Sequence, residues 1–259
     1  MIIDTNVSLS RWPFRRLAGD ETPQLAANLR RRGVTQAWAG SFDGMLHKDI
    51  GSVNARLAAE CRSHGKGLLL PFGSVNPKLP DWREDLRRCH EEHRMAGIRL
   101  HPNYHGYDLK DPLFAELLSM AARRGLIVQV ALKMEDERMQ HPLMRVPSVD
   151  AAPLPDLVKA TEGLRMVVLH WKGMLTGQLC RRLAAAGQVY FEISMLDSLG
   201  TLDQLVEDVS IERVLFGSNY PLFYFEAAVL KIREASLTEL QRQAIFEGNS
   251  RRLSTGTSR

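Results

Sequence analysis

The sequence has few cysteines, no long apolar run and no secretory leader. Its three cysteines, Cys61, Cys89 and Cys180, stand far apart and form no CxxC pair, which argues against a disulfide framework or a zinc knuckle. No stretch of about 18 apolar residues is present, so we expect no membrane span. The first residues show no basic segment followed by an apolar one, as a signal peptide would. We therefore expect a protein of the reducing cytoplasm.

Positive charge is also not concentrated in any one part of the sequence. The net charge is +4, and the basic residues occur in small groups spread evenly along the chain. These groups include Arg15–Arg16, Arg30–Arg32, Arg87–Arg88, Arg123–Arg124, Arg181–Arg182 and Arg251–Arg252. A surface that binds nucleic acid needs a clustered basic face. We therefore predict a small-molecule partner, with neither nucleic acid nor a membrane as a partner.

Strand-like apolar segments alternate with amphipathic helical segments from one end of the chain to the other. Eight βα units in strict alternation predict a parallel sheet, and eight parallel strands predict a closed α/β fold, the (β/α)8 TIM barrel. The open doubly wound alternative needs a glycine-rich turn after the first strand, and the segment DTNVSLS contains no glycine. The expected strands are Ile2–Val7, Thr35–Ser41, Gly67–Val75, Gly97–His101, Leu126–Leu132, Met166–His170, Val189–Ser194 and Arg213–Asn219.

Length and composition agree with one barrel domain. The 259 residues are close to the roughly 250 that a (β/α)8 barrel typically contains. Hydrophobic residues make up 44% of the chain, which is enough for a sizeable core. We predict a single domain over residues 1–253, followed by a frayed C-terminal tail at residues 254–259.

Two long segments follow strand ends, on the face where (β/α)8 barrels carry their active sites. Residues 103–111 form a polar and aromatic segment after the fourth expected strand, and residues 133–152 form a longer one after the fifth. Long βα loops on this face are usually functional or act as lids. We expect these two loops to border the active site.

Polar side chains collect at the ends of the expected strands. Alternate residues of a strand point to the same side, so these side chains converge on one end of the barrel. Such a set suits a small anionic or oxygen-rich substrate, although its members could also do no more than cap strand ends. The set comprises Asp4, Asn6, Ser8, Ser41, Asp43, Ser74, Asn76, Arg99, His101, Gln129, Lys133, His170, Lys172, Glu192, Ser194, Ser218 and Asn219.

Five short motifs occur in order along the chain: MIIDTNVS, GIRLHP, VVLHWKG, LFGSNYP and IFEGNSRRL. Together they resemble the amidohydrolase-2 (amidohydrolase-related) family of hydrolases and decarboxylases. In that family the first strand ends in Asp-x-His-x-His, the sixth ends in a histidine used in acid/base chemistry, and the eighth reads FGSDYP. The resemblance implies a (β/α)8 barrel enzyme whose active site lies at the carboxyl ends of the strands.

The sequence departs from the family pattern where the family binds its metal. Asn6 and Ser8 stand in place of two histidines, Asn219 stands in place of an aspartate, and Gln129 or Ala131 stands where another histidine is common. Neutral amides and hydroxyls are weak ligands for zinc and manganese. We therefore expect no divalent metal cofactor.

An alternative metal site would use histidines outside the family positions. His101 and His105 are four residues apart, and His141 and His170 could join them. The segment HPNYH begins with His-Pro, so a helix that would place the first pair on one face is not expected. Zinc or manganese bound by this route is the less favoured hypothesis.

His170 is the strongest catalytic candidate, because an imidazole takes up and releases a proton near neutral pH. Its alternative role is that of a buried histidine that only satisfies a strand end. His101 and Asn219 are the further catalytic candidates, both able to polarise a substrate carbonyl. Asn219 can hold a substrate oxygen but cannot act as a base.

Two arginines are candidates for gripping a substrate carboxylate. Arg99 and Arg138 could each bind it through paired N–H groups, unless Arg138 pairs with Asp136 or Glu137 inside its own loop. Asp136 or His141 could reach back to the strand ends or belong to a solvated charge run. The predicted substrate-binding set is Asn6, Ser8, Arg99, Gln129, Asp136, Arg138, His141 and Lys172.

Several functions follow from these observations. The first is a metal-independent hydrolase of a small carboxylated or lactone-like substrate, in which His170 activates water. The second is a decarboxylase, since the family contains such enzymes. The third is a non-catalytic barrel that binds a ligand, which the neutral Asn219 favours. A homo-oligomer is left open because barrels of this family often associate.

Overall fold

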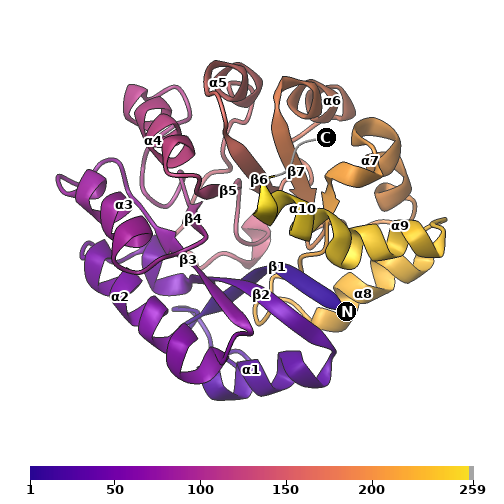
Figure 1. The fold of residues 1–259 in the computed structure, drawn as a ribbon, viewed down its shortest axis with the longest axis horizontal. Coiled ribbons are helices and arrows are strands. Elements are labelled where there is room, and N and C mark those ends of the chain that lie inside the picture. The colour runs from indigo at the N-terminus through magenta and orange to yellow at the C-terminus, as the bar shows by residue number, and fades with distance from the viewer. Residues whose placement is uncertain (257–259) are drawn as a thin grey trace.

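Eight parallel strands form a single (β/α)8 TIM barrel, as the sequence predicts (Figure 1). The structure is a computed structural model that describes residues 1–256. The strands pair in sequence order, each with the next, from β1 to β8. They are β1 (Ile2–Leu9), β2 (Val34–Ser41), β3 (Leu69–Ser74), β4 (Gly97–Leu100), β5 (Ile127–Ala131), β6 (Arg165–Leu169), β7 (Gln188–Glu192) and β8 (Val214–Leu215).

The helices surround the strands as a ring, and α10 lies across one end of the barrel (Figure 1). An amphipathic helix buries its apolar stripe against the sheet, so the helices between successive strands cover the outside of the barrel. The helices are α1 (Thr22–Arg31), α2 (Ile50–Glu60), α3 (Trp82–Glu91), α4 (Pro112–Arg123), α5 (Leu154–Ala160), α6 (Gly177–Ala186), α7 (Thr201–Val209), α8 (Phe225–Glu234), α9 (Glu239–Gln243) and α10 (Asn249–Thr255).

The first and last strands close the barrel. The amide of Thr5 donates to the carbonyl of Phe216 at 2.9 Å, and the amide of Ser8 donates to that of Tyr220 at 3.0 Å. Val7 and Tyr220 form a parallel bridge. The chain therefore continues the pairing beyond the two residues of β8.

Side chains along each strand alternate between the barrel interior and the layer beneath the helices. In β5, Ile127 and Ala131 belong to the interior apolar cluster, whereas Val128 and Val130 pack outward against the helices. This two-residue period is what a strand buried on both faces requires. It decides which polar residues near the strand ends point inward.

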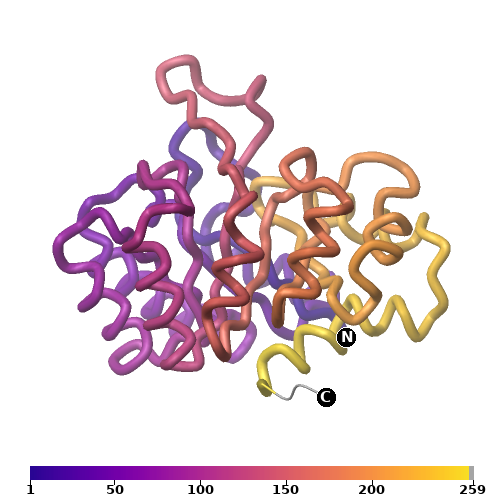
Figure 2. Tube along the Cα trace, turned by 90° about the horizontal axis from the view of Figure 1, so that it is seen from above, coloured from indigo at the N-terminus to yellow at the C-terminus, as the bar shows by residue number. Residues whose placement is uncertain are grey.

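The two ends of the barrel differ in what covers them (Figure 2). The chain ends lie at one end, where Leu253 of α10 packs with the interior cluster. At the other end, which we call the mouth, the strands finish and the segment of residues 133–153 projects beyond the barrel. The last helix ends at Thr255 and so includes the first two residues of the expected tail, residues 254 and 255. Residues 257–259 lie outside the described part.

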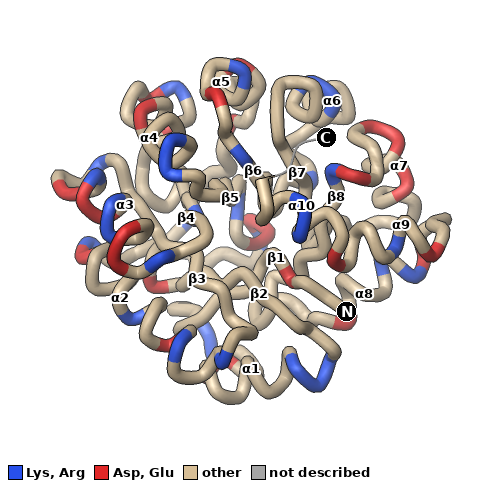
Figure 3. The backbone as a smooth tube through the Cα atoms, viewed as in Figure 1, with Lys and Arg blue, Asp and Glu red and all other residues tan. Residues whose placement is uncertain are grey.

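Charges of both signs are interleaved over the outer helices (Figure 3). Many of them form ion pairs within or between neighbouring helices, such as Arg87 with Glu91 and Arg83 with Glu116. None of the helices in residues 1–256 is both long and apolar enough to cross a bilayer.

Candidate active site

A cluster of buried polar residues lies at the mouth. Asp4 and Asn6 come from β1, Glu192 ends β7, His170 directly follows β6, and Asn219 follows β8 by four residues. None of the five is more than 1% exposed. Hydrogen bonds connect Asp4, Asn6, His170 and Glu192 in that order. The residues predicted from separate strand ends therefore do meet.

The hydrogen bonds of His170 define its protonation. Its Nδ1 lies 2.6 Å from the carbonyl oxygen of Lys133, and a carbonyl only accepts, so Nδ1 carries the proton. Nε2 is then the acceptor in the neutral ring, and Asn6 Nδ2 donates to it at 2.7 Å. Burial lowers the pKa of His170 below its ordinary value of 6.5. His170 is thus a neutral imidazole with a basic Nε2, as a general base requires.

Backbone geometry sets His170 and Asn219 apart from the strands they follow. Both adopt the left-handed conformation, with φ of 54° and 55°. Residues other than glycine rarely do so, and those that do often lie at functional sites. The turn at His170 directs its amide to Glu192 Oε1, which accepts at 2.9 Å.

Glu192 positions His170 through the backbone. Its Oε1 accepts from the His170 amide and from Ser194 Oγ at 2.8 Å, and its Oε2 accepts from the Ser194 amide at 2.8 Å. The carboxylate is buried and fully engaged, so it serves to hold the turn after β6. Glu192 was not among the predicted site residues. The strand period could have indicated that Glu192 points inward, because Tyr190, two residues earlier in the same strand, belongs to the interior cluster.

Asp4 is a second buried carboxyl group that the predicted site left out. It accepts from the amides of Asn6 at 3.1 Å and Ser218 at 3.0 Å, and from Ser218 Oγ. Burial raises the pKa of Asp4 from 3.8 to about 7, and the charge of Glu192 adds to the rise. Asp4 can therefore hold or release a proton near neutral pH.

Several buried polar atoms at the mouth have no hydrogen-bond partner among residues 1–256. They are Asn6 Oδ1, both Nδ2 and Oδ1 of Asn219, and His101 Nδ1. Burial lowers the pKa of His101 well below 6.5, so its ring is neutral. Buried polar groups are normally hydrogen-bonded, so these atoms are the ones that a bound molecule would satisfy. The set contains both donors and acceptors.

Arg99 is engaged inside the barrel. Its guanidinium donates to Gln129 Oε1 at 2.7 Å, Val7 O at 3.0 Å, Ser8 Oγ at 3.1 Å and Trp38 O at 3.1 Å. These four bonds use four of the five N–H groups of a guanidinium. Gln129 in turn donates to the carbonyl of Thr5 at 2.6 Å. For Arg99, Gln129 and Ser8 this geometry favours a structural role over the predicted contact with substrate.

Two loops cover the mouth. Phe14, from the loop after β1, stacks on His141 at 5.6 Å between ring centroids, and Arg15 pairs with the buried Glu135 at 3.1 Å. Trp12 packs edge-on against Phe14. The segments between β1 and α1 and between β5 and α5 thus form one lid, which projects beyond the barrel in Figure 2.

Arg138 and Asp136 of the β5–α5 loop form an ion pair with each other, which the sequence offered as the alternative to binding substrate. Arg138 binds Asp136 at 2.9 Å and is 88% exposed, so neither residue belongs to the buried cluster. His141 is exposed and lies in the lid. Lys172 is half-buried two residues after His170 and forms no hydrogen bond or ion pair within residues 1–256.

Neutral amide and hydroxyl groups stand at the mouth where the family resemblance places metal ligands, at Asn6, Ser8 and Asn219. Within the described residues, no group of three or more His, Cys, Asp or Glu side chains is placed to hold an ion. Ser8 Oγ accepts from Arg99, and the Asn6 amide donates to His170. Of the alternative histidines, His105 donates Nε2–H to the carbonyl of Gly44 at 2.8 Å. Neutral oxygen donors beside a buried guanidinium bind manganese or zinc weakly.

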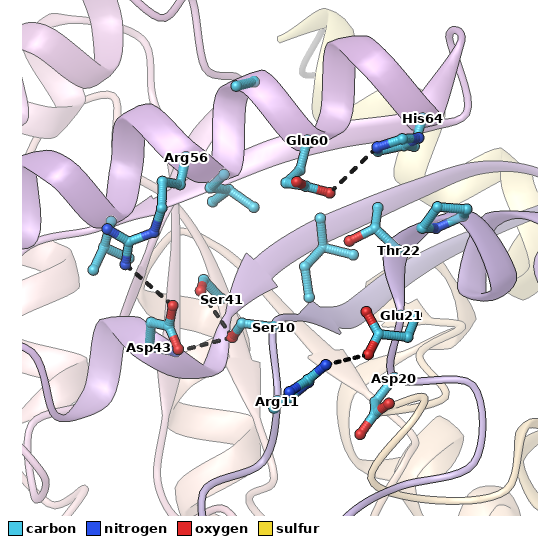
Figure 4. Close-up of a pocket in the computed structure, with 15 residues that line it drawn as sticks. Ser10, Arg11, Asp20, Glu21, Thr22, Ser41, Asp43, Arg56, Glu60 and His64 are labelled. Carbon is cyan, nitrogen blue, oxygen red and sulfur yellow. Dashed lines mark hydrogen bonds and ion pairs between the residues drawn. The ribbon is translucent and has the colours of Figure 1, made fainter.

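A groove of about 620 Å³ lies outside the barrel, beside α1 and α2 (Figure 4). Its charged side chains pair with one another: Arg11 with Glu21, Arg56 with Asp43, and His64 with Glu60. Because these charges are already satisfied, the groove offers a ligand less than the unpartnered atoms at the mouth do.

This (β/α)8 barrel holds a neutral histidine, two amides and two carboxyl groups at the end where barrel enzymes carry their active sites. More narrowly, residues 13–253 match the amidohydrolase model, and the chain belongs to the amidohydrolase-2 family. No curated protein sequence matches the chain.

Solved structures with the same fold include several decarboxylases. The 5-carboxyvanillate decarboxylase of Sphingomonas paucimobilis has a TM-score of 0.74 at 14% identity, covering 99% of both chains. The 2,6-dihydroxybenzoate decarboxylase from Rhizobium has a TM-score of 0.71 at 12% identity, covering 98% of both. The 5-carboxyvanillate decarboxylase of Novosphingobium aromaticivorans, complexed with manganese, has a TM-score of 0.72 at 12% identity, covering 98% of this chain and 96% of the other.

Proposed function

We propose that the protein is a hydrolase that cleaves a small carbonyl compound, such as a lactone, ester or amide, at the barrel mouth. The observation that carries this proposal is the neutral His170, whose Nδ1–H donates to the Lys133 carbonyl and whose Nε2 is basic. Such a base can take a proton from water as the water attacks a carbonyl carbon. The family match supports an enzyme of this kind.

The unpartnered groups around His170 would do the rest of the chemistry. Nδ2 of Asn219 would donate to the substrate carbonyl oxygen and stabilise the charge that develops on it. Water would give its hydroxyl to the carbonyl carbon and its proton to His170 Nε2. The same proton would then pass to the leaving oxygen or nitrogen as its bond to the carbonyl carbon breaks. Asn6, which donates to Nε2 in this structure, would release it to the water.

We also propose that this reaction proceeds without a divalent metal, because amides and hydroxyls stand at the family's ligand positions. The related decarboxylase complexed with manganese gives the opposite expectation. Exhaustive dialysis against EDTA should leave the turnover number within about twofold and the melting temperature unchanged, since bound metal would stabilise the fold. Near-stoichiometric manganese or zinc in protein purified without added metal would contradict this proposal.

A decarboxylase is the second candidate, because similar solved structures are decarboxylases of aromatic acids. The two reactions leave different products. A hydrolase forms a new carboxylic acid together with an alcohol or an amine, whereas a decarboxylase releases carbon dioxide. One substrate panel of lactones, esters, amides and aromatic acids, monitored for both products, separates them.

The decisive experiment measures turnover in His170→Ala and Asn219→Ala against the wild type. Loss of the base should reduce kcat by about 10²- to 10⁴-fold. His64→Ala is the matched control, since His64 lies on the outer groove and is paired with Glu60. If no compound turns over but one raises the melting temperature, the protein is a ligand-binding barrel and the hydrolase proposal is wrong.

A further inference from the structure

Lys133 lies at the mouth, where its backbone meets the catalytic candidate His170. It follows the end of β5 at Ala131 by two residues, after a bend in the chain at Leu132. The direction of its side chain is therefore set by its own contacts and not by the two-residue period of the strand.

Lys133 contacts the His170 segment through both its backbone and its side chain. Its carbonyl accepts the Nδ1–H of His170 at 2.6 Å. Its Nζ lies beside the loop after β6. A Cβ atom added to Gly173 in that loop would be 4.0 Å from the Lys133 Nζ. Its positive charge is one of the influences that lower the pKa of His170. The ammonium group is thus near enough to His170 to act on whatever binds there.

No carboxylate of the same loop forms an ion pair with Lys133 within residues 1–256, although its charge, after that of Arg138, helps to lower the pKa of Asp136. Glu135 pairs with Arg15, and Asp136 pairs with Arg138. Within residues 1–256, no hydrogen bond or ion pair is found for the Lys133 side chain, although the residue is only partly exposed. Lys172, two residues after His170 in the loop after β6, is likewise partly exposed and has no hydrogen bond or ion pair among the described residues. Partly buried cations without a partner attract anions, since leaving the charge unpaired is costly.

We propose that Lys133, assisted by Lys172, binds a carboxylate of the substrate and so places its reacting carbonyl beside His170. This inference rests on the proposed hydrolase function and adds the residue that selects an anionic substrate. It differs from the expectation that Arg99 or Arg138 grips the carboxylate, because both guanidinium groups are occupied. The ammonium group of Lys133 is a point charge that can accompany a carboxylate as the lid closes.

Acetate and acetamide test this proposal without a known substrate, because they share a shape and differ in charge. The ring resonances of His170, followed by NMR at constant ionic strength, should shift saturably with acetate and not with acetamide. Lys133→Met should abolish the acetate response, and Lys133→Arg should retain it. Lys159→Met is the matched control, since Lys159 is exposed in the last turn of α5, away from the end of that helix that adjoins the mouth loop.

The outcomes separate this proposal from the hydrolase proposal. If acetate leaves the His170 resonances unchanged, or shifts them equally in Lys133→Met, the anion subsite is wrong even if the protein hydrolyses uncharged esters. If acetate binds through Lys133 and no carbonyl compound turns over, the subsite stands and the hydrolase proposal fails. Once a carboxylated substrate is found, Lys133→Met should raise KM about tenfold or more with a smaller effect on kcat.

Discussion

At the scale of single residues, Arg99 shows how the barrel interior keeps a charge. It is fully buried, and burial lowers its pKa to about 10, so it remains protonated at neutral pH. The charges of Glu192 and Asp4 favour the protonated form. Gly40 makes room for it, because a Cβ at that position would lie 2.8 Å from the guanidinium. Arg99 thus joins β1, β2 and β5 by hydrogen bonds from the centre of the sheet.

Arg99→Met should destabilise the fold by about 3 kcal/mol, because it leaves the buried carbonyls of Val7 and Trp38 without their donor. Urea unfolding followed by circular dichroism measures the change. Arg62→Met, an exposed arginine on α2's C-terminal side, is the control and should change stability by less than about 0.5 kcal/mol. Unchanged stability with a raised KM for a carboxylated substrate would instead make Arg99 the carboxylate clamp.

Asp4 should make folding stability depend on pH in an uncommon direction. Its folded pKa of about 7 lies above the ordinary 3.8, so the folded state binds one proton more than the unfolded state between these values. The contribution of Asp4 to the free energy of unfolding is therefore complete below pH 3.8, the ordinary pKa of an aspartate. It falls by about 1.4 kcal/mol per pH unit as the pH rises toward 7. The total is on the order of 4 kcal/mol.

Asp4→Asn should remove that slope, because an amide does not titrate in this range. The measurement is the difference in unfolding free energy between wild type and variant, taken by urea titration from pH 4.5 to 7.5. As the pH rises, the variant should become steadily more stable relative to the wild type. A difference that stays constant over this range would mean that Asp4 is ionised throughout.

Sequence reasoning at this scale found the site but not all of its members. His170, Asn6, His101 and Asn219 are buried at the mouth, where the strand ends predict them. Asp4, Glu192 and Lys133 appeared among the polar strand ends but were not chosen, because a pattern of letters does not show which carboxylate holds a backbone turn. Such choices depend on hydrogen bonds between distant segments, for example the one from the His170 amide to Glu192.

At the scale of elements, the strand and helix order follows the sequence, and the boundaries depart from it where the mouth begins. The last strand was expected to run from Arg213 to Asn219 but spans only Val214–Leu215. Arg213 lies in a short 3-10 turn, and Asn219 adopts a left-handed turn. An apolar run predicts the strand, whereas its end is set by the contacts that shape the site.

The lid should open more often when its aromatic contact is removed. Phe14→Ala loses the stack on His141 and the edge contact with Trp12, leaving the Arg15–Glu135 pair to hold the two loops together. Trypsin should then cleave after the exposed Arg138 several-fold faster than in the wild type. Tyr224→Ala, which removes an exposed aromatic side chain before α8, is the control. Equal cleavage rates would show that the two loops do not move together.

At the scale of the whole molecule, the barrel is the most predictable feature, because alternation and period are local properties of the chain. Eight βα units leave few ways to bury eight strands on both faces. The substrate and the assembly state depend on a few side chains and on the outer surface, where charges of both signs are mixed. Nothing local in the sequence specifies them, so the family match identifies a family of enzymes with this fold and does not choose between hydrolysis and decarboxylation.

Closure of the barrel should depend on the last helix as well as on the first strand. Asn249, at the start of α10, is fully buried and donates Nδ2–H to the carbonyls of Ile211 and Val214, both at 2.8 Å. These carbonyls lie at the beginning of β8, so the amide fixes the strand that pairs with β1. Asn249→Ala would leave both acceptors buried and unpaired, at a cost of about 2 kcal/mol.

The variant should therefore unfold at lower urea concentration with an unchanged slope, since the folded state is weakened while the surface exposed on unfolding stays the same. Ser254→Ala is the control, because Ser254 Oγ donates only to a carbonyl of its own helix. Hydrogen exchange would locate the effect. Faster exchange at the amides of Thr5 and Ser8, which donate across the β1–β8 seam, is expected if α10 secures closure, whereas faster exchange confined to α10 would mean that the seam closes without it.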